Sequence, residues 1–139
     1  MPFKFLPHTA DVKIQAEGKS LEEAFKQSAL AVKEVMSSKI KIKAKIRKEI
    51  KVEGEDKESL LYEFLEEFLY LFDAESFIMN KVTKIKITKS KNKLILTAQA
   101  IGDNSSSYKF TNDVKAITYN EMSIKENKGK VAIVFVIDV

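Results

Sequence analysis

Residues 60–72 read Leu-Leu-Tyr-Glu-Phe-Leu-Glu-Glu-Phe-Leu-Tyr-Leu-Phe in this 139-residue chain. The leucine and phenylalanine side chains recur three and four positions apart, so they cover more than half of a helix surface, with glutamates on the remainder. Asp56 lies just upstream and is a suitable N-cap. The sequence therefore predicts a deeply buried helix that ends near Phe72.

The pattern on either side of this helix predicts a second helix and several strands. Ser20 and Glu23 match a capping box, which indicates a helix from there to about Met36. Strands are expected at about residues 3–6, 12–16, 40–52, 80–88, 94–101, 114–124 and 131–137. Lys48 interrupts the apolar face of the 40–52 strand, which favours a bend or bulge there. The 131–137 run is apolar on both faces, as in a central strand.

This order of elements predicts an α+β fold, in which two helices pack on one face of a mostly antiparallel sheet. The length fits a single domain spanning residues 1–139. The chain has no cysteine, which excludes disulfides, thiolate zinc sites and a cysteine nucleophile. Its four glycines are too dispersed for a phosphate-binding loop. No apolar run approaches the ~20 residues of a membrane span, so we expect a cytoplasmic protein.

The net charge of +4 conceals alternating blocks of charge. Residues 39–51 carry seven basic side chains and one acidic side chain. Residues 53–75 carry one basic and nine acidic side chains, and residues 76–93 carry six basic side chains and no acidic one. The two basic segments could bind an RNA backbone, which predicts a steep loss of affinity with salt. Because both segments lack aromatic residues for base stacking, we favour solvated strand faces.

Five positions, near the two ends of the sequence and in its last third, could carry chemistry. His8 is the only histidine, and it either acts in acid–base chemistry or forms a local turn with its neighbours. Asp138 and the α-carboxylate of Val139 offer oxygen donors that suit Ca²⁺ or Mg²⁺, with a solvated terminus as the alternative. If Asp11 joined them, a cation would relieve the repulsion. Lys115 could neutralise such carboxylates or contact a phosphate, or it lies on the solvated face of a strand.

Four segments, taken in order, give the chain a resemblance to a known family. His-Thr-Ala-Asp-Val at 8–12, the stretch 60–75, Val-Lys-Ala-Ile-Thr-Tyr at 114–119 and Val-Ile-Asp-Val at 136–139 together resemble archease. The matches extend over essentially the whole chain. Each one is weak alone, but four in register make a specific signal.

The resemblance implies an accessory protein that activates the RtcB-type tRNA-splicing RNA ligase and meets tRNA only through that ligase. Such proteins promote guanylylation and repeated turnover of the ligase. The resemblance also implies a divalent cation, with calcium the expected ion, held by Asp11, Asp138 and Val139. It assigns the functional lysine to Lys115, and we leave His8 as a support rather than a ligand.

Two positions depart from the family pattern, because Tyr108 and Asn120 stand where members often carry histidines. A mechanism that needed those imidazoles would fail here, whereas the oxygen ligands are untouched. Two alternatives remain open. One is a stand-alone RNA-binding module that uses the basic strands. The other, ranked last, is a metal-dependent phosphoester hydrolase in which Asp11 and Asp138 hold the cation and His8 is the base.

Overall fold

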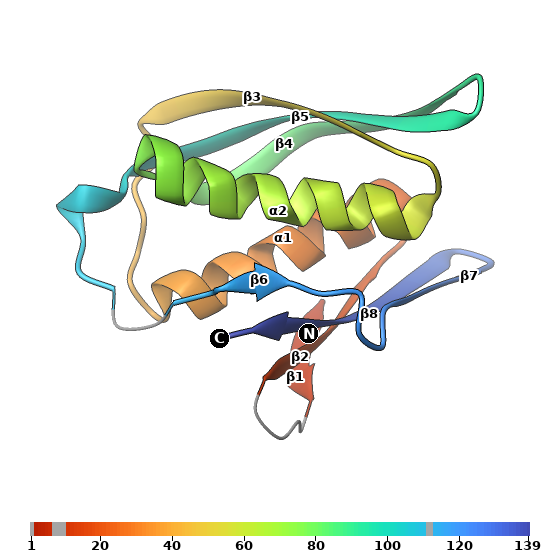
Figure 1. The fold of residues 1–139 in the computed structure, drawn as a ribbon, viewed down its shortest axis with the longest axis horizontal. Coiled ribbons are helices and arrows are strands. Elements are labelled where there is room, and N and C mark those ends of the chain that lie inside the picture. Colours follow the sequence, from red (N-terminus) through yellow and green to blue (C-terminus); the bar gives the residue numbers. More distant parts are fainter. Residues whose placement is uncertain (1, 7–10, 111–112) are drawn as a thin grey trace.

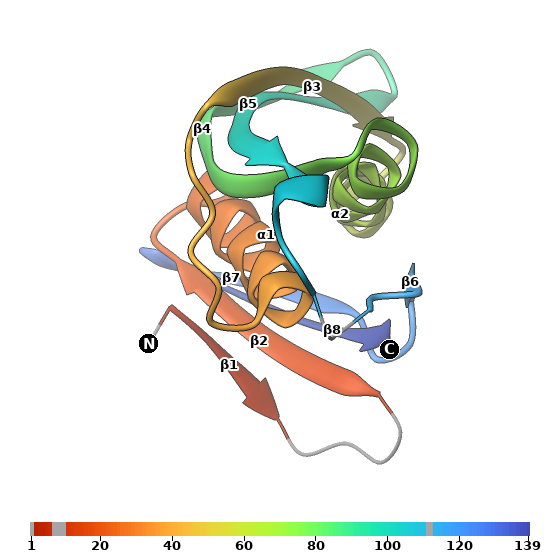
Figure 2. The same cartoon turned by 90° about the vertical axis from the view of Figure 1, so that its left-hand side faces the viewer.

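A computed structural model describes residues 2–6, 11–110 and 113–139, and its two helices lie between two antiparallel sheets (Figures 1 and 2). The helices are α1 (Leu21–Ser37) and α2 (Lys57–Glu75), with a 3-10 turn at Ser105–Ser107. One sheet has the order β1 (Phe3–Leu6), β2 (Val12–Gly18), β8 (Lys130–Asp138), β6 (Ala116–Ile117), and β7 (Ser123–Asn127) also pairs with β8. The other has the order β3 (Ile46–Gly54), β5 (Lys93–Asn104), β4 (Phe77–Ser90).

The capping residues read from the sequence start both helices. Ser20 accepts a hydrogen bond from the backbone N–H of Glu23 over 3.1 Å at the start of α1. Asp56 accepts one from the backbone N–H of Ser59 over 2.7 Å, and the Ser59 hydroxyl accepts the N–H of Asp56 in return. These bonds satisfy donors that the first helical turn cannot pair internally, so the predicted helix starts are confirmed.

A single core joins the helices to both sheets. Phe25 of α1 stacks against Phe64 of α2 with ring centroids 5.9 Å apart, and both side chains are fully buried. Phe135 of β8 is also fully buried. Because β8 pairs with β2 on one edge and with β6 and β7 on the other, it is the central strand that its apolar sequence predicts. The predicted α+β class is confirmed, and the strands divide into two sheets that enclose the helices.

Two expected strands are wrong in detail. The 40–52 strand begins only at Ile46, and its pairing with β5 is regular, so no bulge lies at Lys48. Lys48 instead forms an ion pair with Glu75 over 2.7 Å, which satisfies its charge at the edge of the core. The irregularities fall in β4, at Met79/Lys81 and Thr83/Lys86.

The expected strand at 114–124 is also wrong, because a turn divides it into β6 and the start of β7. Glu121 in this turn has a positive φ of 56°. Such a backbone conformation interrupts regular strand pairing. The turn lets the chain pair twice with the same edge of β8.

Gly102 permits the close approach of β5 to β4. A Cβ atom at this position would lie 1.9 Å from the backbone oxygen of Ile78. Any side chain would therefore force the strands apart.

In the part of the chain described here, neither helix combines the length and apolar character that a bilayer crossing requires.

Candidate functional site

The start of β2 and the end of β8 bring the two predicted aspartates to one edge of the first sheet. Val12 pairs with Ile137 in an antiparallel register. Asp11 directly precedes Val12, and Asp138 directly follows Ile137. Since neighbouring strands lie about 4.8 Å apart, residues that are 127 positions apart in sequence become neighbours. Figure 2 shows the carboxyl end of the chain beside the start of β2.

β6 brings Lys115 to the same edge from the other side of β8. Ala116 pairs with Asp138, and the backbone N–H of Lys115 donates to the carbonyl oxygen of Asp138 over 2.8 Å. Lys115 therefore lies next to the chain terminus at Val139. The structure thus gathers Asp11, Lys115, Asp138 and Val139 at one end of the sheet. His8 lies outside the described residues.

The side chains at this edge are open to solvent. Asp138 and Lys115 are exposed, Val139 is 38% exposed, and Asp11 is half-buried. Lys115 forms no ion pair with any residue that the structure describes. Its ammonium group is therefore available for an anion that arrives from outside.

Among the described residues, the candidate metal ligands at this edge are all oxygen atoms. Within residues 2–6, 11–110 and 113–139, no three histidine, cysteine, aspartate or glutamate side chains form a metal-binding group. The aspartates supply two carboxylates, and Val139 directly follows Asp138. An all-oxygen donor set that is open to water fits a hard cation such as Ca²⁺. The residues present are therefore compatible with the expected ion.

The segment 114–119 is fastened to the end of β8 along its length. Val114 is buried, and Thr118 donates from its hydroxyl to the carbonyl oxygen of Val136 over 2.7 Å. Tyr119 stacks on Tyr62 of α2, with centroids 4.5 Å apart and rings within 9° of parallel. The segment that carries Lys115 is thus held on both the sheet and the helix.

An ion pair beside the site was not predicted from the sequence. Lys13, two residues after Asp11, contacts Glu121 in the turn after β6 over 3.0 Å. The pair spans 108 positions. It joins β2 to the segment that carries Lys115, and only the strand pairing could have revealed it.

Tyr108, one of the two departures from the family pattern, belongs to a separate polar cluster. Its hydroxyl donates to Asp103 over 2.7 Å and accepts the backbone N–H of Lys43 over 3.0 Å. Asp103 is only 7% exposed, and the hydrogen bond from Tyr108, followed by that from the Asn104 backbone, lowers its pKa. Tyr108 therefore links Asp103 of β5 to the segment before β3 at Lys43. Asn120, the other departure, lies in the turn before β7 and donates its N–H to Thr118.

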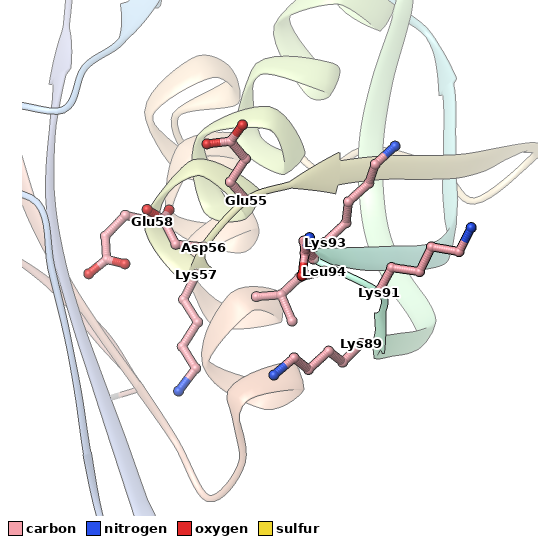
Figure 3. A pocket seen from close by; sticks show the side chains of 9 residues that line it. Glu55, Asp56, Lys57, Glu58, Lys89, Lys91, Lys93 and Leu94 are labelled. Atoms are coloured by element: carbon pink, nitrogen blue, oxygen red, sulfur yellow. The ribbon is translucent and has the colours of Figure 1, made fainter.

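A hollow lies away from these residues, between the start of α2 and the β4–β5 hairpin (Figure 3). It has a volume of about 570 Å³. Carboxylates such as Glu55 and Glu58 line its helix side, and Lys89, Lys91 and Lys93 line its hairpin side. The mixed lining contains no histidine and no residue of the sheet edge, so the hollow does not contribute to the candidate site.

The two-sheet fold and the sheet end where Asp11 meets Asp138 beside Lys115 define a small α+β protein with carboxylates and a lysine at one end of its first sheet. The model of the Archease protein family matches residues 3–139. Curated relatives named Protein archease include one from Sulfolobus acidocaldarius, 40% identical over 99% of this chain and 98% of that protein. Another, from Pyrococcus furiosus, is 46% identical over 85% of this chain and 84% of that protein. The chain belongs to the archease family.

Solved structures agree with this assignment. The solution structure of Methanobacterium thermoautotrophicum protein 1598 matches 99% of both chains, with a TM-score of 0.82 and 30% identity. A crystal structure from Thermotoga maritima, described as an archease and possible chaperone, matches with a TM-score of 0.62 over 98% of this chain and 96% of that one. At 21% identity this second likeness concerns the fold alone.

Proposed function

We propose that this chain is an accessory protein that activates an RtcB-type tRNA-splicing RNA ligase by promoting its guanylylation and turnover. Membership of the archease family supports the proposal. The observation that carries it furthest is the convergence of Asp11, Asp138 and the chain terminus beside Lys115. The charge and the oxygen ligands that the described residues offer at this edge support an accessory role at a partner's site.

In this proposal Asp11, Asp138 and the carboxylate of Val139 hold a divalent cation, with calcium the expected ion. The bound ion would supply concentrated positive charge for phosphate oxygens. The pairing of β2, β8 and β6 fixes the relative positions of the donors before any partner arrives, so little ordering is left for the docking step. Lys115 lies at the same edge with its charge uncompensated, and it would bind a phosphate or a carboxylate of the ligase.

The test is a guanylylation assay of the cognate ligase, run with and without this protein and with and without a calcium chelator. Asp11→Asn and Asp138→Asn should reduce stimulation by at least about tenfold, or about 1.4 kcal/mol. Asp73→Asn is the matched control, because Asp73 is exposed near the carboxyl end of α2 and lies on none of the strands that form the candidate site. Full stimulation by both site variants would contradict the proposal.

A second measurement separates the roles of the carboxylates and the lysine. Calorimetric titration with calcium should show loss of binding in Asp138→Asn. Lys115→Gln should bind calcium at least as tightly as the wild type, because it removes a positive charge near the ion, yet fail to stimulate the ligase. A hydrolase would instead release phosphate from a phosphoester without any ligase present.

A further inference from the structure

The outer face of the β3–β5–β4 sheet carries cations from two sequence segments that are about 30 residues apart. Exposed residues of β3 pair through β5 with residues of β4 that are exposed on the same face. Arg47 lies opposite Ile101, which lies opposite Lys81. Lys51 lies opposite Thr97, which lies opposite Lys86. The register therefore combines the two basic blocks into one surface, which we call the basic face.

The basic face has a regular layout. Arg47 and Lys51 form one rim on β3 and lie roughly 13 Å apart, at about 3.3 Å per residue. Lys81 and Lys86 form the other rim on β4, roughly 10 Å away across two strand spacings. Between the rims, Thr97 of β5 is exposed and Gln99 is half-buried. Hydroxyl and amide groups thus line a strip with positive charges on both sides.

The carboxylates on this face have an ion-pair or hydrogen-bond partner within the protein, whereas the cations of the rims form no ion pair with a described residue. Glu53 forms an ion pair with Lys93 over 3.3 Å, and Glu49 accepts a hydrogen bond from Gln99 over 3.0 Å. No residue in the described part of the chain forms an ion pair with Arg47, Lys51, Lys81 or Lys86. Glu49 lies between Arg47 and Lys51 and keeps its charge, so the face is net positive, with two rows of cations that are complementary to a chain of phosphates.

We infer that the basic face binds the phosphate backbone of RNA directly and without sequence preference. Lysine and arginine neutralise phosphates, and threonine and glutamine side chains commonly contact phosphate and sugar oxygens. The face presents no aromatic ring to stack on a base, because its exposed positions are basic, acidic, amide, hydroxyl or aliphatic. Recognition therefore depends on the backbone.

The basic face and the edge with Asp138 belong to different sheets, with both helices between them (Figure 1). An RNA on the basic face would leave the Asp138 edge uncovered. The inference extends the proposed function but does not rest on it, since RNA binding here needs no ligase.

The test measures the anisotropy of a fluorescent 16-nucleotide oligouridylate, which pairs and stacks least among RNA homopolymers, so that its phosphates dominate binding. With three to four phosphates neutralised on a single strand, raising the salt from 50 to 200 mM should weaken binding about 20- to 50-fold. A mixed-sequence RNA of equal length should bind within about twofold of the oligouridylate.

The variant K51E/K81E/K86E should weaken binding at least about tenfold at 50 mM salt. The matched control K4E/K125E/K128E changes the net charge equally at exposed lysines of the other sheet and its β7–β8 turn, and it should retain wild-type affinity within about threefold. Circular dichroism melts verify that both variants fold. Equal losses in both variants, or equal binding of polyglutamate and RNA by the wild type, would overturn the inference.

Discussion

The backbone N–H of Lys115 donates to the carbonyl oxygen of Asp138 over 2.8 Å, so the segment that carries the exposed lysine is tied to the penultimate residue of the chain. On the other edge of β8, Val12 pairs with Ile137. The last three residues therefore lie between two segments that come from the beginning and the last third of the sequence. A change at the carboxyl end should affect the candidate site far more than the fold.

Extending the chain by Gly-Ser after Val139 tests this point. The extension moves the terminal carboxylate away from Asp138, while the paired residues of β8 end at Asp138 and remain intact. We expect calcium affinity to fall at least about tenfold and the melting temperature to stay unchanged. The same two residues added before Met1 are the control. Unchanged calcium binding by the extended protein would exclude the terminal carboxylate as a ligand.

Phe135→Ala should destabilise the protein by about 3–5 kcal/mol, because it opens a cavity in the central strand of the first sheet. Phe135 is fully buried in the core that joins both helices to this sheet. Tyr70→Ala is the control, because Tyr70 is 54% exposed on α2 and its replacement should cost no more than about 0.5 kcal/mol. Urea denaturation measures both values, and similar losses in the two variants would contradict the assignment of the core.

Helix starts and the central strand were predictable because their signals are local. The caps at Ser20 and Asp56 act within one helical turn. The segment before Ile46 was not predictable in the same way. Its alternating pattern resembles a strand, but the N–H groups of Lys43 and Lys45 pair instead with the Tyr108 hydroxyl and the Gly102 carbonyl, which are more than fifty residues away.

In the candidate site too, the individual residues had local sequence signals, whereas their proximity depends on long-range strand pairing. Sequence motifs pointed to Asp11, Lys115 and Asp138 individually, and their meeting was an expectation. The β2–β8 and β6–β8 registers bring them together. The sequence showed two basic segments but not that they share one face, and the Lys13–Glu121 ion pair had no sequence signal, because both depend on which strands are neighbours.

Glu66→Gln and Glu67→Gln should each raise the melting temperature at pH 7. Burial raises the pKa of Glu66, followed by repulsion from Glu63 and Asp73. Burial also raises the pKa of Glu67, followed by repulsion from Glu75 and Glu63. A raised pKa means that the folded state binds the proton more tightly, so each carboxylate costs stability as the pH rises above about 4.3. The gain should vanish near pH 3, and melts recorded between pH 3 and 7 check it. An equal gain at every pH would show that charge is not the cause.

Tyr108→Phe should lower the melting temperature at pH 7 and should matter less in acid. The Tyr108 hydroxyl donates to Asp103 and lowers its pKa, with a smaller effect from the Asn104 backbone. Because the folded state then holds the proton less tightly than the unfolded chain, this group stabilises the fold above about pH 4, and the contribution is lost as the pH falls through the lowered pKa. Tyr70→Phe is the matched control, since the exposed Tyr70 has no hydrogen bond to a residue that the structure describes. Circular dichroism melts from pH 2 to 7 should show the Tyr108→Phe and wild-type curves converging as the pH falls through the lowered pKa of Asp103. Parallel curves across that range would mean that the hydroxyl supports packing and the Lys43 backbone rather than the ionised carboxylate.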